Sequence, residues 1–332
     1  MSSTANSNSN NSTPGSWSTS IDKSGEYKRK ESVFRNWISP DGEFKPEAGR
    51  YHLYVCLACP WAHRTLIVRA LKGLENAISY DVVDWFLDGS RGWAFNQSDD
   101  KTRGGRDSIN DFERLRQVYE QSDPEYSGNI TVPVLYDKKT KRIVNNESSE
   151  IIQMLNNQFN NFSATPEQAK LDLYSSELKQ SIDEVNEWVY PQINNGVYRC
   201  GFATSQSAYE KAFYELFGGL DKVEQILSKS RYLNSNSQLT LADVRLFTTL
   251  IRFDTVYHHH FKTNLRKITE YPAIYEYMKE IYQIPSIRAT VDHDHIKKHY
   301  MVSHKSINPH GIVAVGPDLS LLDVPHKRDK QY

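Results

Sequence analysis

The sequence predicts an α/β domain followed by an all-helical domain. Strand and helix patterns alternate within residues 48–158, whereas helical patterns dominate residues 159–300. Aromatic residues are plentiful enough for a large core, with 20 Tyr, 13 Phe and 6 Trp. A chain of 332 residues also has the length of about two domains.

Both ends of the chain are expected to lack regular secondary structure. Residues 1–20 are almost all Ser, Asn, Thr, Gly and Pro, which bury too little apolar surface to offset the entropy lost on ordering, so we predict a disordered arm. Residues 21–47 are charged and are expected to form an irregular extension whose rings dock on the body of the protein. Those rings belong to Tyr27, Phe34, Trp37 and Phe44. The proline-containing tail, residues 301–332, is predicted to be extended.

The elements of the first domain follow from its apolar patterns and its turn residues. The predicted order is a strand at 51–57, a helix at 62–74, a strand at 77–86, a long loop at 87–111, a short helix at 112–120, strands at 131–137 and 141–145, and a helix at 148–157. This order is that of a thioredoxin-like domain.

One helix of the second domain has a clearly marked start. Thr240 can cap the N–H of Asp243, and the Asp243 carboxylate can reach back to the Thr240 N–H, which is a capping box. The residues that follow are mostly apolar, so we expect this helix to be central to the all-helical domain.

Composition excludes several classes of function. The net charge is −1 and the pI is about 6.8, so the overall charge favours neither nucleic acid nor a membrane surface. No apolar run approaches the roughly 18–20 residues of a membrane span, and the first residues do not resemble a secretory signal. Three cysteines do not make a disulfide framework. A reducing, cytoplasmic location is therefore expected.

Cys59 is the residue that most directly indicates chemistry. It follows a predicted strand and precedes Pro60 and a helical pattern, and proline is best tolerated in the first turn of a helix. The helix N-terminus then faces the sulfur and favours the nucleophilic thiolate. Cys56 and Cys59 form a C-x-x-C pair, but the usual position of the partner, inside the helix, is Ala62. Cys59 is therefore interpreted as a monothiol and Cys56 as structural.

Two further segments indicate a ligand that contains a thiol and an α-amino acid. Pro133 lies within a strand-like run, and with Cys59 upstream we predict a cis peptide opposite the cysteine, with the backbone of Val132 pairing with the ligand. Glu147 and Ser148 precede an apolar helical pattern. An Asn or Ser of residues 145–149 can simply cap that helix, or the start of the helix can receive the carboxylate of a γ-glutamyl group while Glu147 holds its ammonium. Glutathione has such a group.

These segments together resemble a known family. The resemblance spans about residues 30–317 and is carried by 51–55, 57–64, 123–128, 131–135, 145–152, 196–198, 201–203, 292–293, 303–304, 307–309 and 311–313. In these strings the chain closely resembles the glutathionyl-hydroquinone reductases, the xi class of glutathione transferases, which is related to the omega class. Two departures are Cys56, where serine is usual, and Met301, where a second tyrosine is common.

The resemblance implies a role for each matching residue. It makes Cys59 the nucleophile, and Tyr198 and Tyr300 the tyrosines that face the aromatic substrate. Contacts with glutathione fall to Trp93, Arg116, the Val132 backbone beside Pro133, Glu147 and Ser148.

The implied reaction is the glutathione-dependent reduction of S-glutathionyl-hydroquinones through a Cys59–glutathione mixed disulfide. Glutathione is then a co-substrate, an aromatic quinol is the product, and a homodimer is expected. Two alternatives stay open: an omega-like thiol transferase or dehydroascorbate reductase, and a regulatory protein without catalysis, suggested by the Ser/Asn-rich start. The histidines of 258–260 and 293–299 are not expected to bind a metal, since adjacent histidines on a helix cannot converge on one ion.

Overall fold

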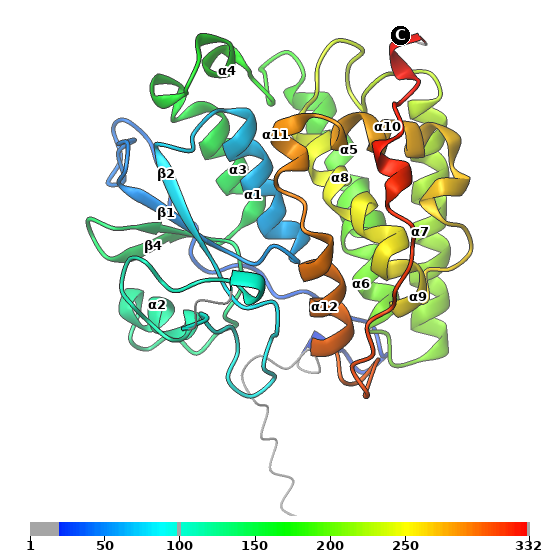
Figure 1. Cartoon of the computed structure of the whole chain (residues 1–332), viewed down its shortest axis with the longest axis horizontal. Helices are drawn as coiled ribbons and strands as arrows, with labels where there is room; N and C mark the ends of the chain where they lie inside the picture. The colour runs from blue at the N-terminus through cyan, green and yellow to red at the C-terminus, as the bar shows by residue number, and fades with distance from the viewer. Residues whose placement is uncertain (1–19, 98–100, 331–332) are drawn as a thin grey trace, which may run out of the picture.

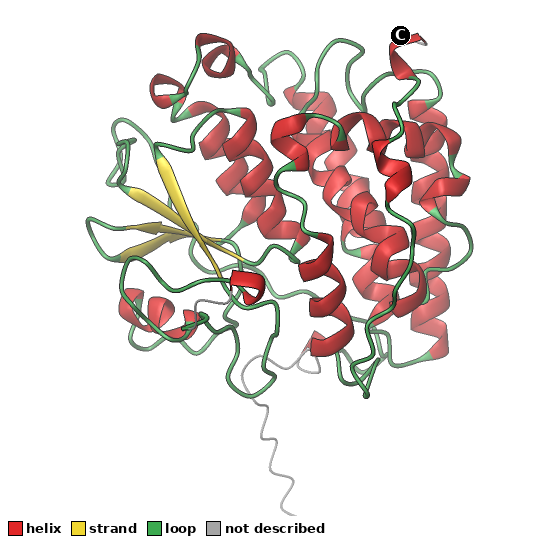
Figure 2. Ribbon diagram, viewed as in Figure 1, coloured by secondary structure: helices red, strands yellow, loops and turns green. Residues whose placement is uncertain are grey.

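The computed structural model describes residues 20–97 and 101–330. The arm predicted for 1–20 lies outside these residues except for Ser20. A small sheet with its helices stands beside a larger group of helices (Figure 1; Figure 2). This arrangement confirms the predicted fold class, and we propose 48–158 and 159–300 as the limits of the two domains.

The sheet has four strands in the order β2-β1-β3-β4. Strand β1 runs parallel to β2 and antiparallel to β3, which pairs antiparallel with β4. The strands are β1 (Tyr51–Val55), β2 (Ile78–Val82), β3 (Val134–Asp137) and β4 (Arg142–Asn145). The helices of this domain are α1 (Pro60–Leu71), α2 (Leu115–Ser122) and α3 (Ser148–Asn157). Helices α1 and α3 cover one face of the sheet and α2 lies on the other (Figure 1).

The strands are shorter than predicted where the chain serves the site. The strand predicted for 131–137 begins only at Val134, because Pro133 has no N–H for the sheet and follows a cis peptide. Helix α1 begins earlier than the predicted residue 62, since Pro60 occupies its first position.

The second domain is helical throughout its described length. Its helices are α4 (Pro166–Lys170), α5 (Lys179–Val189), α6 (Gly196–Gly201), α7 (Gln206–Leu227), α8 (Leu241–Arg252), α9 (His258–His260), α10 (Pro272–Tyr282), α11 (Pro285–Arg288) and α12 (His293–Ser303). Two short π-helical segments, Tyr190–Asn194 and Phe253–Tyr257, interrupt the α-helical pattern. Such segments are rare and occur frequently at functional sites.

The predicted start of α8 is confirmed. The Asp243 carboxylate accepts from the Thr240 N–H at 2.8 Å and from its hydroxyl at 2.7 Å. It also accepts from the Leu233 N–H at 2.9 Å and from the Tyr277 hydroxyl at 2.8 Å. All but one side chain of α8 are buried, and the helix packs against α1. Together with α11, which also packs against α1, it joins the two domains.

The extension over 21–47 docks its rings with one exception. Tyr27 and Phe44 are buried, and Phe34 packs against the ring of Tyr126 at 5.4 Å. Trp37 is 43% exposed, so the prediction is wrong for this ring. The extension bonds to β4 through the Asn36 N–H, which donates to Val144 O at 3.0 Å.

The tail after α12 has little regular structure, as predicted. It contains two short 3₁₀ helices, Ser320–Asp323 and Arg328–Lys330. Arg328 is buried and its Nε lies 2.9 Å from a carboxylate oxygen of Glu280. The tail is thus anchored to α10. No helix among the described residues is long and apolar enough to span a membrane.

Candidate active site

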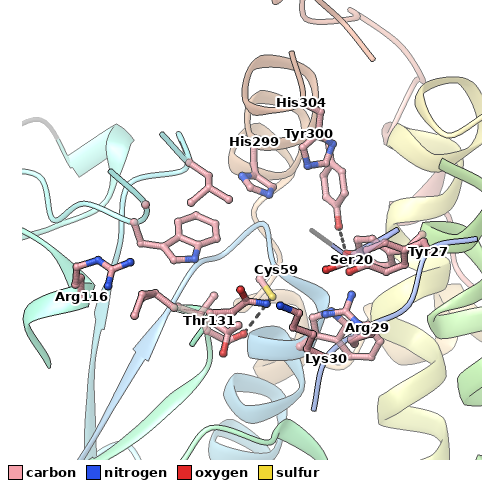
Figure 3. A pocket seen from close by; sticks show the side chains of 18 residues that line it. Ser20, Tyr27, Arg29, Lys30, Cys59, Arg116, Thr131, His299, Tyr300 and His304 are labelled. Carbon is pink, nitrogen blue, oxygen red and sulfur yellow. Dashed lines mark hydrogen bonds between the residues drawn. The ribbon is translucent and has the colours of Figure 1, made fainter. Parts of the chain in front are cut away.

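Cys59 lies at the N-terminus of α1 and lines a cavity between the two domains (Figure 3). Its thiol faces the backbone carbonyl of Val132, with 3.7 Å between Sγ and the oxygen. The peptide bond between Val132 and Pro133 is cis, which confirms the prediction. The cysteine and the cis peptide therefore face each other across one end of the cavity.

The surroundings of Cys59 act on the pKa of its thiol in opposite directions. Burial raises the pKa of the thiol, whereas the backbone N–H groups of Ala62 and Trp61 and the charges of Arg252 and Arg29 lower it. Burial outweighs the rest, and the pKa lies above its usual value. The amide groups at the helix N-terminus thus favour the thiolate as expected, but they do not offset the loss of hydration.

Arg252 holds the loop that carries Cys59, and no motif in the sequence indicated this role. Its guanidinium donates to Ala58 O at 2.9 Å, to Leu57 O at 3.0 Å and to Thr248 O at 2.8 Å. The residue ends α8 and is fully buried. The helical domain thus fixes the backbone immediately before the nucleophile.

Glu147 and Ser148 line a second cavity that adjoins the first. Five residues line both cavities: Arg29, Lys30, Trp61, Thr131 and Val132. The Glu147 carboxylate caps α3 by accepting from the Ser149 N–H at 3.0 Å, and it accepts from the Ser32 hydroxyl at 3.1 Å. Burial opposes its ionisation, but these hydrogen bonds and the charge of Arg64 hold the pKa of Glu147 below its ordinary value. The helix is thus capped by Glu147 and not by the Asn or Ser expected, and the charged carboxylate still faces a cavity.

Positive groups surround that carboxylate. The Arg64 guanidinium donates to Ser148 Oγ at 3.3 Å and lies 4.5 Å from the centroid of the Trp61 ring. Arg245 of α8 lines the same cavity. A carboxylate next to the buried guanidinium of Arg64, with Arg245 and a helix N-terminus nearby, suits a zwitterion such as an α-amino acid.

Trp93 and Arg116 line the cavity of Cys59. Trp93 comes from the long loop and stacks on His299, with 5.3 Å between ring centroids. Arg116 lies on α2, and its guanidinium is 3.8 Å from Glu120, with about a third of the side chain exposed. The structure thus brings both residues to the site that the resemblance implies for them.

Tyr198 of α6 and Tyr300 of α12 meet in this cavity, with their hydroxyl oxygens 2.5 Å apart. Sequence reasoning missed the hydroxyl of Tyr257, which lies 3.0 Å from that of Tyr300 and comes from a π-helical segment. Burial raises the pKa of all three hydroxyls, so they are neutral hydrogen-bond donors.

The N-terminal extension also enters the cavity, which the sequence did not reveal. Tyr27, Arg29 and Lys30 line it next to Cys59 (Figure 3). Among the described residues no group of three or more His, Cys, Asp or Glu side chains is arranged to hold a metal ion. Nearby, His260 and His304 pair with each other, 3.1 Å between ring nitrogens.

Two sequence profiles match the chain. Residues 58–158 match "Glutathione S-transferase, N-terminal domain", and residues 206–280 match "Glutathione S-transferase, C-terminal domain". The chain is 48% identical to glutathionyl-hydroquinone reductase YqjG of Escherichia coli, over 95% of this chain and 96% of that protein.

Solved structures agree with these matches. Glutathione-S-transferase Xi from Phanerochaete chrysosporium superposes with a TM-score of 0.88 and 50% identity, covering 92% of this chain and 97% of the other. The glutathione-bound structure of YqjG from E. coli superposes with a TM-score of 0.86 and 49% identity, covering 90% and 97%. This chain therefore belongs to the glutathionyl-hydroquinone reductases, the xi class of the glutathione transferases.

Proposed function

We propose that this protein is an enzyme that uses glutathione to reduce S-glutathionyl-hydroquinones to hydroquinones. One observation carries the proposal: the Cys59 sulfur, the cis peptide before Pro133 and the Tyr198–Tyr300 hydroxyl pair line one cavity. The sulfur can reach a thioether while the hydroxyls contact the oxygens of its aromatic ring.

The adjoining cavity suits the γ-glutamyl end of the substrate. Glu147 binds the ammonium, and Ser148 at the start of α3 binds the carboxylate. The backbone of Val132, held by the cis peptide, pairs with the cysteinyl part of glutathione. Trp93 and Arg116 hold the glycyl end, where the guanidinium faces a carboxylate.

The first step transfers glutathione to the enzyme. The Cys59 thiolate attacks the glutathione sulfur, the new S–S bond forms, and the bond between that sulfur and the ring carbon breaks. The electron pair of the broken bond passes to the ring, and a proton added at the same carbon completes the hydroquinone. Tyr198 and Tyr300 donate hydrogen bonds to the ring oxygens and so favour this flow of electrons.

The second step regenerates the enzyme. The thiolate of a second glutathione attacks the glutathione sulfur of the mixed disulfide, releasing glutathione disulfide and the Cys59 thiolate. Glutathione is therefore the reductant, and the ring carbon is the group reduced.

Incubation with S-glutathionyl-menadiol and glutathione tests this function. Wild-type protein is expected to release menadiol and glutathione disulfide, and the Cys59→Ala variant to release neither. Reduction of small mixed disulfides without menadiol release would favour the omega-like thiol transferase, and activity on neither substrate would favour the regulatory alternative. The intact Cys59, with Glu147 and Ser148 beside it, supports catalysis over regulation.

A cytoplasmic homodimer completes the proposal. Light scattering on the purified full chain tests the oligomeric state, and cell fractionation tests the location.

A further inference from the structure

The cavity around Cys59 has a one-sided charge. Among the described residues that line it there is no carboxylate, and its Arg and Lys side chains are those of Arg29, Lys30 and Arg116. Arg116 is assigned above to glutathione. The other two cations come from the N-terminal extension (Figure 3) and lie where the two cavities meet. A cavity of this composition favours a ligand that carries negative charge or acquires it during the reaction.

Arg29 is held in place by two aromatic faces. Its guanidinium carbon lies 4.6 Å from the centroid of the Trp61 ring and 5.1 Å from that of the Tyr198 ring, distances at which cation and ring attract each other. Its Nε donates to Asn195 Oδ1 at 3.2 Å. The guanidinium is thus fixed between α1 and α6, beside the tyrosine that is proposed to face the quinol.

One nitrogen of this guanidinium has no acceptor. Nη2 of Arg29 is buried and forms no hydrogen bond with the described residues. A buried donor without a partner is costly, and each such group needs an explanation. The other contacts of Arg29 are with ring faces and one amide oxygen, and among the described residues no carboxylate forms an ion pair with it.

We propose that Arg29 stabilises the negative charge that develops on the quinol ring as the carbon–sulfur bond breaks. This inference rests on the proposed function, in which the ring receives the electron pair of that bond before a proton reaches the ring carbon. The free Nη2 donates to the ring oxygen or to the electron-rich ring while Tyr198 and Tyr300 donate to the oxygens. The extension is then part of the catalytic site and not only a covering segment.

A leaving-group series tests the proposal. S-Glutathionyl-hydroquinones with hydrogen, methyl or chlorine on the ring differ in how well the ring bears negative charge. In Arg29→Gln, kcat/KM is expected to fall about 100-fold for the methyl-substituted ring. The fall is expected to be smaller for the chlorinated ring, because the chlorine itself stabilises negative charge on the ring. The matched control is Lys28→Gln, because Lys28 is in the same extension but is exposed and paired with Glu26.

Reduction of a small glutathione mixed disulfide distinguishes an effect on the aromatic ring from an effect on the Cys59 nucleophile. That reaction needs the Cys59 thiolate but forms a thiolate leaving group without a ring, so the ratio of the quinol rate to the disulfide rate isolates the effect on the ring. We expect this ratio to fall in Arg29→Gln and to recover in part in Arg29→Lys, which keeps the charge but not the planar fork of donors.

An unchanged ratio, or an equal loss on all rings, would overturn the proposal and leave Arg29 with a structural role. Thermal melting shows whether Arg29→Gln folds; if it does not, Arg29→Lys is measured over the same ring series, where a steeper dependence on the substituent is expected and a wild-type dependence would overturn the proposal. Absence of menadiol release by the wild type would instead reject the proposed function.

Discussion

The two ends of the site meet at Cys59 but differ in construction. The end proposed for glutathione comes from short continuous stretches, the cis peptide at Pro133 and the start of α3 with Glu147. The end proposed for the aromatic ring comes from distant segments, with Tyr198 on α6 and Tyr300 on α12. The first end can be found in local sequence patterns, whereas the second exists only in the folded chain.

The two ends also differ in charge. The glutathione end carries fixed charges, with ionised Glu147 close to Arg64, because its ligand has permanent charges of both signs. The aromatic end presents neutral hydroxyls whose pKa values are raised by burial, beside the positive charge of Arg29 and with no carboxylate among the described lining residues. This suits the proposed ligand, a neutral ring that becomes negatively charged only during the reaction. Fixed donors held ready for such a charge are the usual means of electrostatic catalysis.

The largest effect is expected from a substitution of Cys59, where the two ends of the site meet. Cys59→Ser is expected to lower kcat about 1000-fold or more, since a serine hydroxyl is a far weaker nucleophile toward the glutathione sulfur than a thiolate. Release of hydroquinone and glutathione disulfide is the measurement. Cys56→Ser is the control and is expected to keep activity, because Cys56 is buried and its pKa is raised by burial. Loss of activity in Cys56→Ser would contradict the monothiol mechanism.

The next change acts on the aromatic end alone. Tyr300→Phe removes the central hydroxyl of the chain from Tyr198 to Tyr257, and we expect kcat for quinol release to fall about 100-fold. The KM for glutathione and the reduction of small disulfides are expected to stay as in the wild type. Tyr209→Phe is the matched control, as its hydroxyl donates to the carbonyl of Lys262 at the surface. An equal loss with small disulfides would mean that the hydroxyl chain serves Cys59 and not the ring.

The difference between the ends also explains what could be predicted from the sequence. The order strand, Cys59, Pro60, helix and the cis peptide at Pro133 follow from neighbouring residues, and the bounds of the helix at 148–157 were predicted without error. Local patterns succeed there because capping and proline geometry act within a few residues.

The remaining parts of the site depend on tertiary contacts. Arg29, Tyr257 and Arg252 have no local signal, because each reaches the site from more than 25 residues away along the chain. Tyr198 and Tyr300 were found through the resemblance and not through spacing. Trp37 failed as a docked ring because an aromatic residue in an irregular segment carries no period that would show which side faces the core.

A smaller effect is expected from the glutathione end. Glu147→Gln keeps the shape of the cap but removes the charge that is proposed to pair with the ammonium, so the KM for glutathione should rise about 10-fold while kcat changes little. Steady-state kinetics with varied glutathione is the measurement. Glu150→Gln is the control, since Glu150 lies in the first turn of the same helix but pairs with Arg35 of the extension. A KM that rises equally in both variants would assign the effect to the start of α3 as a whole.

The smallest expected effect concerns acid, and it too distinguishes the two ends. His260 and His299 are buried beside the aromatic end, and burial lowers the pKa of each to about 4. An unfolded imidazole binds its proton below about pH 6.5. Between these values the unfolded chain therefore binds more protons than the folded one, so stability is present above pH 6.5 and is lost as the pH falls toward 4. For each pH unit of acidification, each histidine lowers the free energy of unfolding by about 1.4 kcal/mol at most.

Melting temperatures from pH 7 to 4.5 measure this loss in the wild type and in His299→Gln. The variant is expected to have a lower melting temperature at pH 7, because His299 bonds to the carbonyl of Trp85, but a shallower decline with acid, because one neutral buried imidazole is gone. The described lining of the glutathione end holds no histidine, and its Glu147 contributes stability that is lost only below about pH 4.5. A decline equally steep in the variant would mean that acid acts elsewhere, and no decline in the wild type down to pH 4.5 would mean that the buried imidazoles do not set the acid sensitivity.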